Sequence, residues 1–224
     1  MLFVHGQPGS GTMWGPLPHF VAPFANVVTF DRPGWGEPEN AAGNLASNVS
    51  YLDSVVGLFS GQPPVLLGYS YGAAVVINWL AETRPYQSRA LLVAPAANQL
   101  AYGTVDRVFE LELLGGIWSL LGLGLGTRIG KRAAVANLYR ARSLLFESQN
   151  LLADLGKVNY LLPDDARVEI IAGLLDRIVP PSAVVALAAT LGVDDVFWSP
   201  RQGHMVIWKD PELIAMHLAR LLRS

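Results

Sequence analysis

A serine between two glycines is the first feature of this chain that could support chemistry. The segment GYSYG, residues 68 to 72, lies between the apolar run PPVLL and the small-residue stretch AAVVINWL. A tight turn from a strand into a helix brings Cβ atoms against the chain, and glycines at 68 and 72 remove those atoms. Ser70 would then be exposed at the turn as a nucleophile. The alternative is a glycine-rich turn whose serine caps the helix.

A nucleophilic serine needs a base, and the base needs a group that orients it. Of the four histidines, His204 follows the last predicted strand and precedes the terminal helix, on the rim where parallel sheets bind ligands. Asp176, in EIIAGLLDRIVPP, follows another predicted strand and should lie on the same rim. Such loop residues are more often solvated or part of turns. The chain order Ser70, Asp176, His204, with each residue after a different strand, nevertheless predicts a Ser-His-Asp triad.

Acyl transfer also requires two hydrogen-bond donors for the oxyanion of the tetrahedral intermediate. The backbone N–H of Tyr71, directly after the serine, is the first candidate. The loop after the first predicted strand reads HGQPGSG, and because Pro8 has no N–H, Gln7 is the natural second donor. We expect His5 to form hydrogen bonds behind this loop rather than to act as a base.

Short β-rich runs alternate with segments of helical spacing, which predicts an α/β fold with a mostly parallel sheet and helices on both faces. The predicted strands are Leu2 to His5, Val27 to Phe30, Pro64 to Gly68, Ala90 to Val93, Arg167 to Ala172 and Asp195 to Trp198. The predicted helices are Val49 to Phe59, Ala73 to Glu82, Ser182 to Leu191 and Pro211 to Leu222. Residues 95–163 carry helical rather than strand patterns, which predicts a helical cap between the core segments 1–94 and 164–224.

The composition narrows the class of protein. The chain has 224 residues, 51% of them hydrophobic, which suits one domain with a large core. Sixteen basic and 18 acidic side chains give a net charge of -2, so no basic face is available for nucleic acid. We expect no metal and no organic cofactor. The start of the chain does not read as a signal peptide, and residues 113–127 are too glycine-rich and too few to span a bilayer. The sequence therefore predicts a cytoplasmic protein without a membrane span.

Together, these motifs resemble those of the α/β-hydrolase superfamily. HGQPGSG is similar to its oxyanion loop, DRPGWGEP at 31–38 to its Asp-x-Pro-Gly-x-Gly turn and GYSYG to its nucleophile elbow; AGLLDRIVP and GHM match its acid and histidine positions. The resemblance runs from residue 5 to residue 204. It implies the α/β-hydrolase fold, a cofactor-free serine mechanism and a lid formed by residues 95–163. Compared with that family, the first two strands are missing, either because the start is truncated or because the sheet begins at the family's third strand. In the second case the resemblance places the strand from Val27 to Phe30 at an open edge, where a second subunit could pair to give a homodimer.

The predicted substrate is a small carboxylic ester or thioester with an apolar acyl part, cleaved through an acyl-enzyme intermediate. Trp118, Leu121 and Met205 are the residues predicted to contact it. Alternatively, such residues pack the cap onto the core. The same triad could instead perform carbon-carbon bond hydrolysis, a lyase reaction or perhydrolysis. The motifs are also compatible with a ligand-binding, receptor-like protein with little turnover, or with an inactive fragment.

Overall fold

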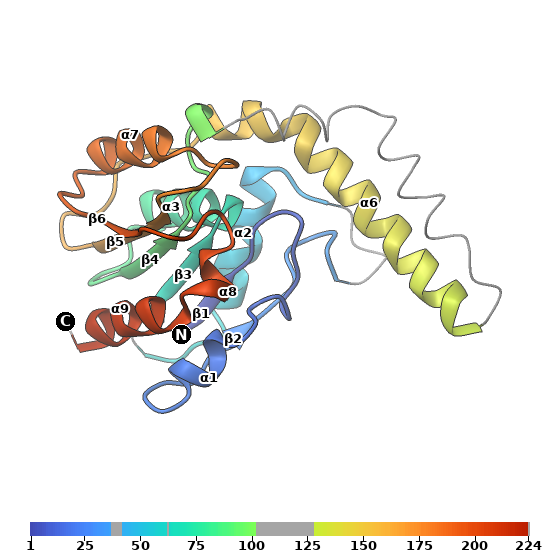
Figure 1. Ribbon diagram of the computed structural model, residues 1–224, viewed down its shortest axis with the longest axis horizontal. Helices are drawn as coiled ribbons and strands as arrows, with labels where there is room; N and C mark the ends of the chain where they lie inside the picture. Colours follow the sequence, from blue (N-terminus) through green and yellow to red (C-terminus); the bar gives the residue numbers. More distant parts are fainter. Residues whose placement is uncertain (37–41, 62, 102–127, 224) are drawn as a thin grey trace.

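A single sheet of six parallel strands forms the centre of the computed structural model, which describes residues 1–36, 42–61, 63–101 and 128–223 (Figure 1). The strand order is β2-β1-β3-β4-β5-β6, and every neighbouring pair is parallel. The strands are β1 (Leu2–Val4), β2 (Val28–Thr29), β3 (Leu66–Tyr69), β4 (Arg89–Val93), β5 (Arg167–Gly173) and β6 (Val196–Ser199). All six predicted strands are confirmed, and their ends differ from the prediction by at most two residues.

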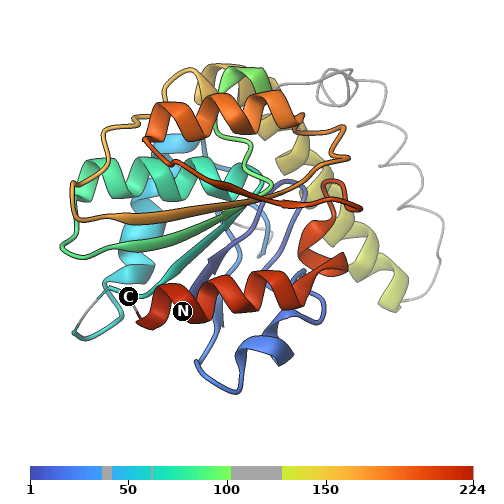
Figure 2. The same cartoon turned by 60° about the vertical axis from the view of Figure 1, so that its left-hand side comes forward.

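Helices cover both faces of the sheet (Figure 2). The described helices are α1 (Leu17–Val21), α2 (Leu45–Val56), α3 (Tyr71–Thr83), α6 (Arg128–Leu155), α7 (Pro181–Leu191), α8 (Val206–Lys209) and α9 (Pro211–Arg223), with a 3-10 turn, η1, at Gln99–Ala101. One core layer joins the sheet to α2, α3, α7 and the last turns of α6. The other joins it to α1, α8 and α9. The predicted α/β fold with two covered faces is thus confirmed.

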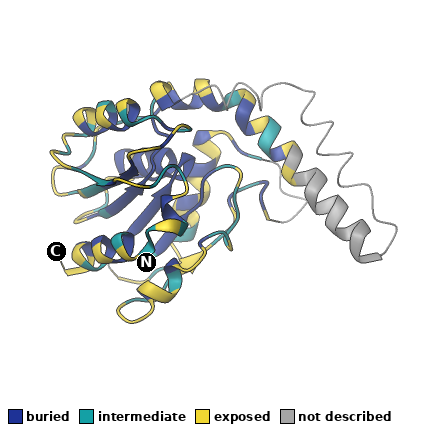
Figure 3. Ribbon diagram, viewed as in Figure 1, coloured by how far each residue is buried: buried dark blue, intermediate teal, exposed yellow. Residues whose placement is uncertain are grey.

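The strands are apolar on both faces because each face packs under helices. In β1, Leu2 and Val4 pack into the layer with α2 and α3, whereas Phe3 packs into the layer with α9. All three side chains are fully buried, and the residues of β3 and residues 90–93 of β4 are buried as well (Figure 3). Parallel strands covered on both sides require such continuous apolar runs. The sheet is therefore a rigid base for the loops at its ends.

Two helical features differ from the prediction. Helix α2 begins at Leu45, four residues before the expected start, because the side chain of Asn44 accepts a hydrogen bond from the N–H of Ser47 and caps the helix. The helices α1 and α8 were not predicted, since elements of five and four residues are too short to show a helical period.

The strand β2 forms one edge of the sheet, and both of its residues are exposed. The open edge expected there is present, and pairing with a second subunit remains a prediction. In the region predicted to be the cap, the described part consists of η1, α6 and the segment that leads to β5. The predicted substrate contacts Trp118 and Leu121 lie outside the described residues.

Candidate active site

Ser70 lies at the turn between β3 and α3 in a strained backbone conformation. Its φ is 53° and its ψ is -124°, a combination that residues with a side chain rarely adopt. Ser70 is the N-cap residue of α3, yet its side chain makes no capping hydrogen bond. A helix-capping role, the alternative weighed from the sequence, is therefore not what its side chain performs.

The two flanking glycines make this turn possible. A Cβ at Gly68 would lie 2.7 Å from the Cα of Ala73, and a Cβ at Gly72 would collide with the carbonyl oxygens of Val4 and His5. Backbone atoms cannot move aside as a flexible side chain could. The packing reason inferred for both glycines from the sequence is confirmed by these contacts.

Ser70, His204 and Asp176 come together in one chain of hydrogen bonds. The Nε2 of His204 lies 3.1 Å from the Oγ of Ser70, and its Nδ1 lies 2.8 Å from the Oδ2 of Asp176. The other oxygen of Asp176 accepts the backbone N–H groups of Ile178 and Val179, at 2.8 and 2.9 Å. This fixes the carboxylate so that Oδ2 faces His204. With the ring proton on Nδ1, Nε2 is free to accept the proton of the serine hydroxyl.

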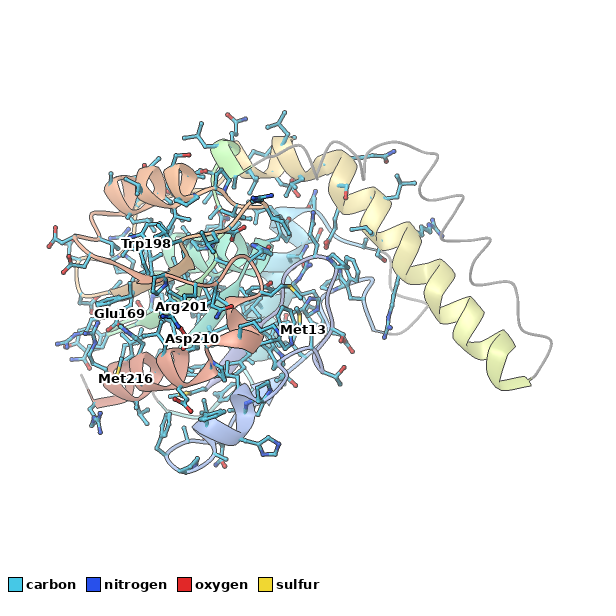
Figure 4. All side chains as sticks on the ribbon, in the orientation of Figure 1. Met13, Glu169, Trp198, Arg201, Asp210 and Met216 are labelled. Carbon is cyan, nitrogen blue, oxygen red and sulfur yellow. The ribbon has the colours of Figure 1, made fainter. Side chains whose placement is uncertain are left out.

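Other carboxylates near the sheet have different partners. Asp210, which Figure 4 labels beside α8, accepts a hydrogen bond from the hydroxyl of Ser199 at 2.7 Å. Glu169, near the start of β5, contacts His217 and Arg220 of α9. Asp176 is thus the carboxylate that the fold brings to His204.

A tyrosine next to the serine holds the loop of His204. The hydroxyl of Tyr69 donates to the carbonyl oxygen of His204 at 3.1 Å, and the two rings lie 5.4 Å apart. The ring of Trp208 packs edge-on against Tyr69 at 5.6 Å. Burial, together with the nearby charge of Asp176, raises the pKa of Tyr69 above its ordinary value, so the hydroxyl keeps its proton. Sequence reasoning missed this residue because it occupies a variable place within GYSYG.

The HGQPGSG loop packs directly against the serine. A Cβ at Gly6 would lie 2.7 Å from the Cβ of Ser70 and 3.3 Å from its Oγ. Behind the loop, the Nε2 of His5 accepts the N–H of Arg32 at 3.0 Å, so Nδ1 carries the proton and donates to the carbonyl of Gly6 at 2.8 Å. Burial first, and then the charge of Arg32, lower the pKa of His5 well below its usual value. His5 is a neutral hydrogen-bonding residue behind the loop, as expected.

Comparison with known proteins gives the family. The family model described as "Alpha/beta hydrolase family" matches residues 1–217. The chain belongs to this family. The match confirms the fold and the resemblance drawn from the motifs, and it agrees with the prediction of an α/β-hydrolase enzyme.

Relatives of this α/β-hydrolase include a lipase, an esterase and a bromoperoxidase. Lipase LipV of Mycobacterium tuberculosis is 32% identical over 114 residues, which are 50% of this chain and 43% of that protein. The chain spans less than half the length of the curated relatives that it matches. The esterase EaEST from Exiguobacterium antarcticum superposes with a TM-score of 0.75 at 14% identity, over 100% of this chain and 91% of that one. The bromoperoxidase from Bacillus anthracis does so with a TM-score of 0.72 at 14% identity and the same coverage. At these identities the two structures show the fold alone.

Three further observations on this α/β-hydrolase concern the predicted substrate contact Met205, the lengths of the helices and Arg32. The predicted substrate contact Met205 follows His204 and is 53% exposed at the rim. Within the described ranges, no helix combines the length and the apolar character needed to cross a bilayer. Arg32, beneath the HGQPGSG loop, was not singled out from the sequence, because its partner Glu147 is 115 residues away and no local spacing links the two.

Proposed function

We propose that this α/β-hydrolase is a serine hydrolase that cleaves small carboxylic esters or thioesters with an apolar acyl part. The observation that carries the proposal is the hydrogen-bonded chain from Ser70 through His204 to Asp176 at the carboxyl ends of β3, β5 and β6. A buried carboxylate that orients an imidazole toward a strained, glycine-flanked serine is the arrangement that activates a hydroxyl. The name of the relative Lipase LipV, which matches half of the chain, favours an ester over other acyl compounds.

The reaction would proceed in two halves. His204 takes the hydroxyl proton of Ser70 as the serine oxygen attacks the carbonyl carbon, and Asp176 stabilises the imidazolium that results. The backbone N–H groups of Tyr71 and Gln7 stabilise the oxyanion. His204 then gives its proton to the leaving alcohol or thiol, which leaves an acyl group on Ser70. In the second half, His204 takes a proton from water as the water oxygen attacks the acyl carbon. The bond from that carbon to the Oγ of Ser70 then breaks, His204 returns the proton to the Oγ, and the carboxylic acid is released.

Exposed apolar side chains next to the three residues support an apolar acyl part. Leu174 and Leu175, immediately before Asp176, are 47% and 61% exposed, and Met205 follows His204. Apolar groups that a protein leaves exposed beside a reactive centre are suited to contact a substrate. We propose that they bind the acyl chain together with Trp118 and Leu121 of the predicted cap, residues 95–163, which would act as a lid.

A fluorophosphonate probe tests the proposal, because it reacts with an activated serine. The wild-type protein should be labelled, and Ser70→Ala should abolish labelling. His204→Ala should lower the kcat on p-nitrophenyl esters about 10⁴-fold or more, as the loss of a triad member does. His19→Ala, which changes an exposed histidine on α1, is the matched control and should retain full activity.

The dependence of activity on the length of the acyl chain tests whether the substrate has an apolar acyl part. Other outcomes of the same assays point to the alternative functions. Activity should rise from the acetate to the octanoate if the acyl part binds to apolar side chains. Label that survives in Ser70→Ala would overturn the proposal. A folded wild-type protein that is neither labelled nor active would point to ligand binding without turnover. Turnover confined to β-diketones, or dependent on hydrogen peroxide, would point to carbon-carbon bond cleavage or perhydrolysis.

A further inference from the structure

Arg32 is a buried cation whose five N–H groups all have acceptors. Its Nε donates to the carbonyl of His5 at 2.9 Å, and Nη1 donates to the Oδ1 of Asn48 at 2.8 Å. Glu147 of α6 accepts from both ends of the guanidinium, with Oε1 at 2.6 Å from Nη1 and Oε2 at 3.0 Å from Nη2. The remaining N–H, on Nη2, donates to the carbonyl of Gly6 at 3.0 Å. Both side chains of the ion pair are 1% exposed, so this set of bonds is shielded from water.

The bond to Gly6 acts on the proposed oxyanion donor. The carbonyl of Gly6 and the N–H of Gln7 are the two ends of one peptide group, and the group is planar. Because this peptide is trans, its N–H points away from the side that its carbonyl faces. That carbonyl accepts two hydrogen bonds, from Arg32 and from the Nδ1 of His5 at 2.8 Å. When the carbonyl of a peptide group accepts hydrogen bonds, the N–H of the same peptide becomes a stronger donor and its direction is fixed.

The other proposed donor is supported in a similar way by different groups. The N–H of Tyr71 shares a peptide group with the carbonyl of Ser70, which accepts the backbone N–H groups of Ala73 at 2.9 Å and Ala96 at 3.1 Å. These supports are neutral and belong to the core of the fold. Of the two peptides, it is that of Gln7 that a charged side chain supports, and that side chain depends on a helix from a distant part of the chain.

Helix α6 contacts this region through three buried polar side chains on one face. Glu147 holds Arg32, Ser143 donates to the carbonyl of Gly34, and Asp154 accepts from the hydroxyl of Tyr71 at 2.9 Å. The guanidinium of Arg32 also lies 5.0 Å from the centre of the Tyr71 ring. The position of α6 is thereby linked to both residues that carry the proposed donors.

We propose that Arg32, held by Glu147, is a positioning residue that orients and polarises the Gln7 N–H. The position of α6 therefore determines how strongly the oxyanion hole stabilises the negative charge. The inference rests on the proposed function, since it concerns how the same site stabilises the oxyanion. It adds that α6, which belongs to the predicted lid, takes part in tuning the site through a chain of contacts from Glu147 to Arg32 to the peptide of Gly6.

The variant Glu147→Gln tests this link with a small change in shape. It replaces one accepting oxygen by an amide that faces the N–H groups of Arg32. The matched control is Glu169→Gln, which changes another glutamate of an ion pair near the opposite ends of the strands.

Two measurements report on the oxyanion hole itself. The first is kcat/KM on a p-nitrophenyl ester, divided by the number of sites that a fluorophosphonate titrates, so that unfolded protein does not count. The second is the inhibition constant of an alkyl trifluoromethyl ketone, whose adduct with a serine carries a negative oxygen. For Glu147→Gln we expect about a tenfold loss in kcat with little change in KM, and an equal weakening of the ketone. The control Glu169→Gln should stay within about twofold.

A stability role alone would give a different result. Glu147→Gln would then lower the fraction of titratable sites but leave the rate per site and the ketone affinity unchanged, which would overturn the inference. A loss equal to that in Glu169→Gln would overturn it as well. If the wild-type protein is neither labelled nor active, the proposed function fails instead.

A measurement on the wild-type protein does not depend on whether a variant folds or whether the protein is active. In a carbon-13 and nitrogen-15 labelled sample, the carbonyl carbon of Gly6 and the amide proton of Gln7 should both resonate downfield of ordinary loop values, because the carbonyl accepts two hydrogen bonds. Ordinary shifts at both nuclei would show that the peptide is not polarised and would contradict the inference.

Discussion

Two glutamates near opposite ends of the strands, Glu147 on α6 and Glu169 on β5, form ion pairs with very different surroundings. Glu147 pairs with Arg32 at the carboxyl-end rim, where both side chains are 1% exposed. Glu169 pairs with Arg220 near the amino end of β5, where the arginine is 53% exposed. Glu169 also contacts His217, whose side chain is buried. The two clusters have similar partners but differ in how much water reaches them.

This difference assigns the two clusters to different tasks. An exposed pair contributes little to stability, because water and salt screen the charges. A buried pair is costly to assemble, and losing one partner leaves an unpaired charge in the interior. At the amino end, Glu169 ties α9 to the sheet. At the carboxyl end, the Arg32 pair holds the backbone of the loop beside Ser70, where small displacements would matter for catalysis.

The largest expected effect is on global stability. Glu147→Ala should lower the free energy of unfolding by about 3–5 kcal/mol, because it leaves the guanidinium of Arg32 buried without its main partner. Glu169→Ala should cost less, about 1–3 kcal/mol, since Arg220 can turn to water and only the buried Nδ1 of His217 loses its partner. Urea unfolding followed by tryptophan fluorescence measures both values. Equal losses of unfolding free energy in the two variants would show that burial does not determine how much each ion pair contributes to stability.

The second prediction compares a glycine that has no room for a side chain with a glycine that has open space around it. Gly72→Ala at the carboxyl-end rim should cost about 3 kcal/mol and remove fluorophosphonate labelling, because the new methyl group meets the carbonyl oxygens of Val4 and His5. Gly192→Ala, at the end of α7, has open space around it and should cost only about 1 kcal/mol for its φ of 66°. Thermal unfolding and labelling of the two variants check this. A labelled and stable Gly72→Ala protein would refute the packing argument.

The smallest expected effect is a change in the free energy of unfolding with pH. It comes from His5, whose ring accepts the backbone N–H of Arg32. Folding lowers the pKa of His5 below its ordinary value of 6.5, so the unfolded chain binds a proton first as the pH falls. The contribution of His5 to stability is complete above pH 6.5. It is lost below that value, by at most about 1.4 kcal/mol per pH unit, until the folded protein takes up the proton as well.

The variant His5→Asn isolates this contribution, because asparagine has a donor and an acceptor but does not titrate. Unfolding free energies measured by urea between pH 7 and pH 5 should fall more steeply for the wild-type protein than for the variant. Other titrating groups are common to both proteins and cancel in the difference. Parallel curves would mean that His5 is not kept neutral by the fold.

The three residues of the proposed triad could be predicted because each stands directly after a strand. In a parallel sheet the carboxyl ends of all strands lie at the same edge. Residues that follow different strands in the sequence, as Ser70, Asp176 and His204 do, are therefore expected to lie near one another in space. Tyr69 and Arg32 could not be found this way. Tyr69 is placed by its hydroxyl against the backbone of a loop 135 residues later, and Arg32 by a helix 115 residues later.

The amino-acid sequence by itself determined the order of strands and helices, the two glycines at the serine and the rim to which the reactive side chains belong. These follow from local periodicity and from steric limits on the backbone, which act within a few residues. Only the tertiary structure decided that the hydroxyl of Tyr69 holds the loop of His204, that Ser70 does not cap its helix, and that Arg32 supports the peptide of Gly6. Such choices depend on hydrogen bonds and burial between segments distant along the chain, and these are set only when the layers pack together.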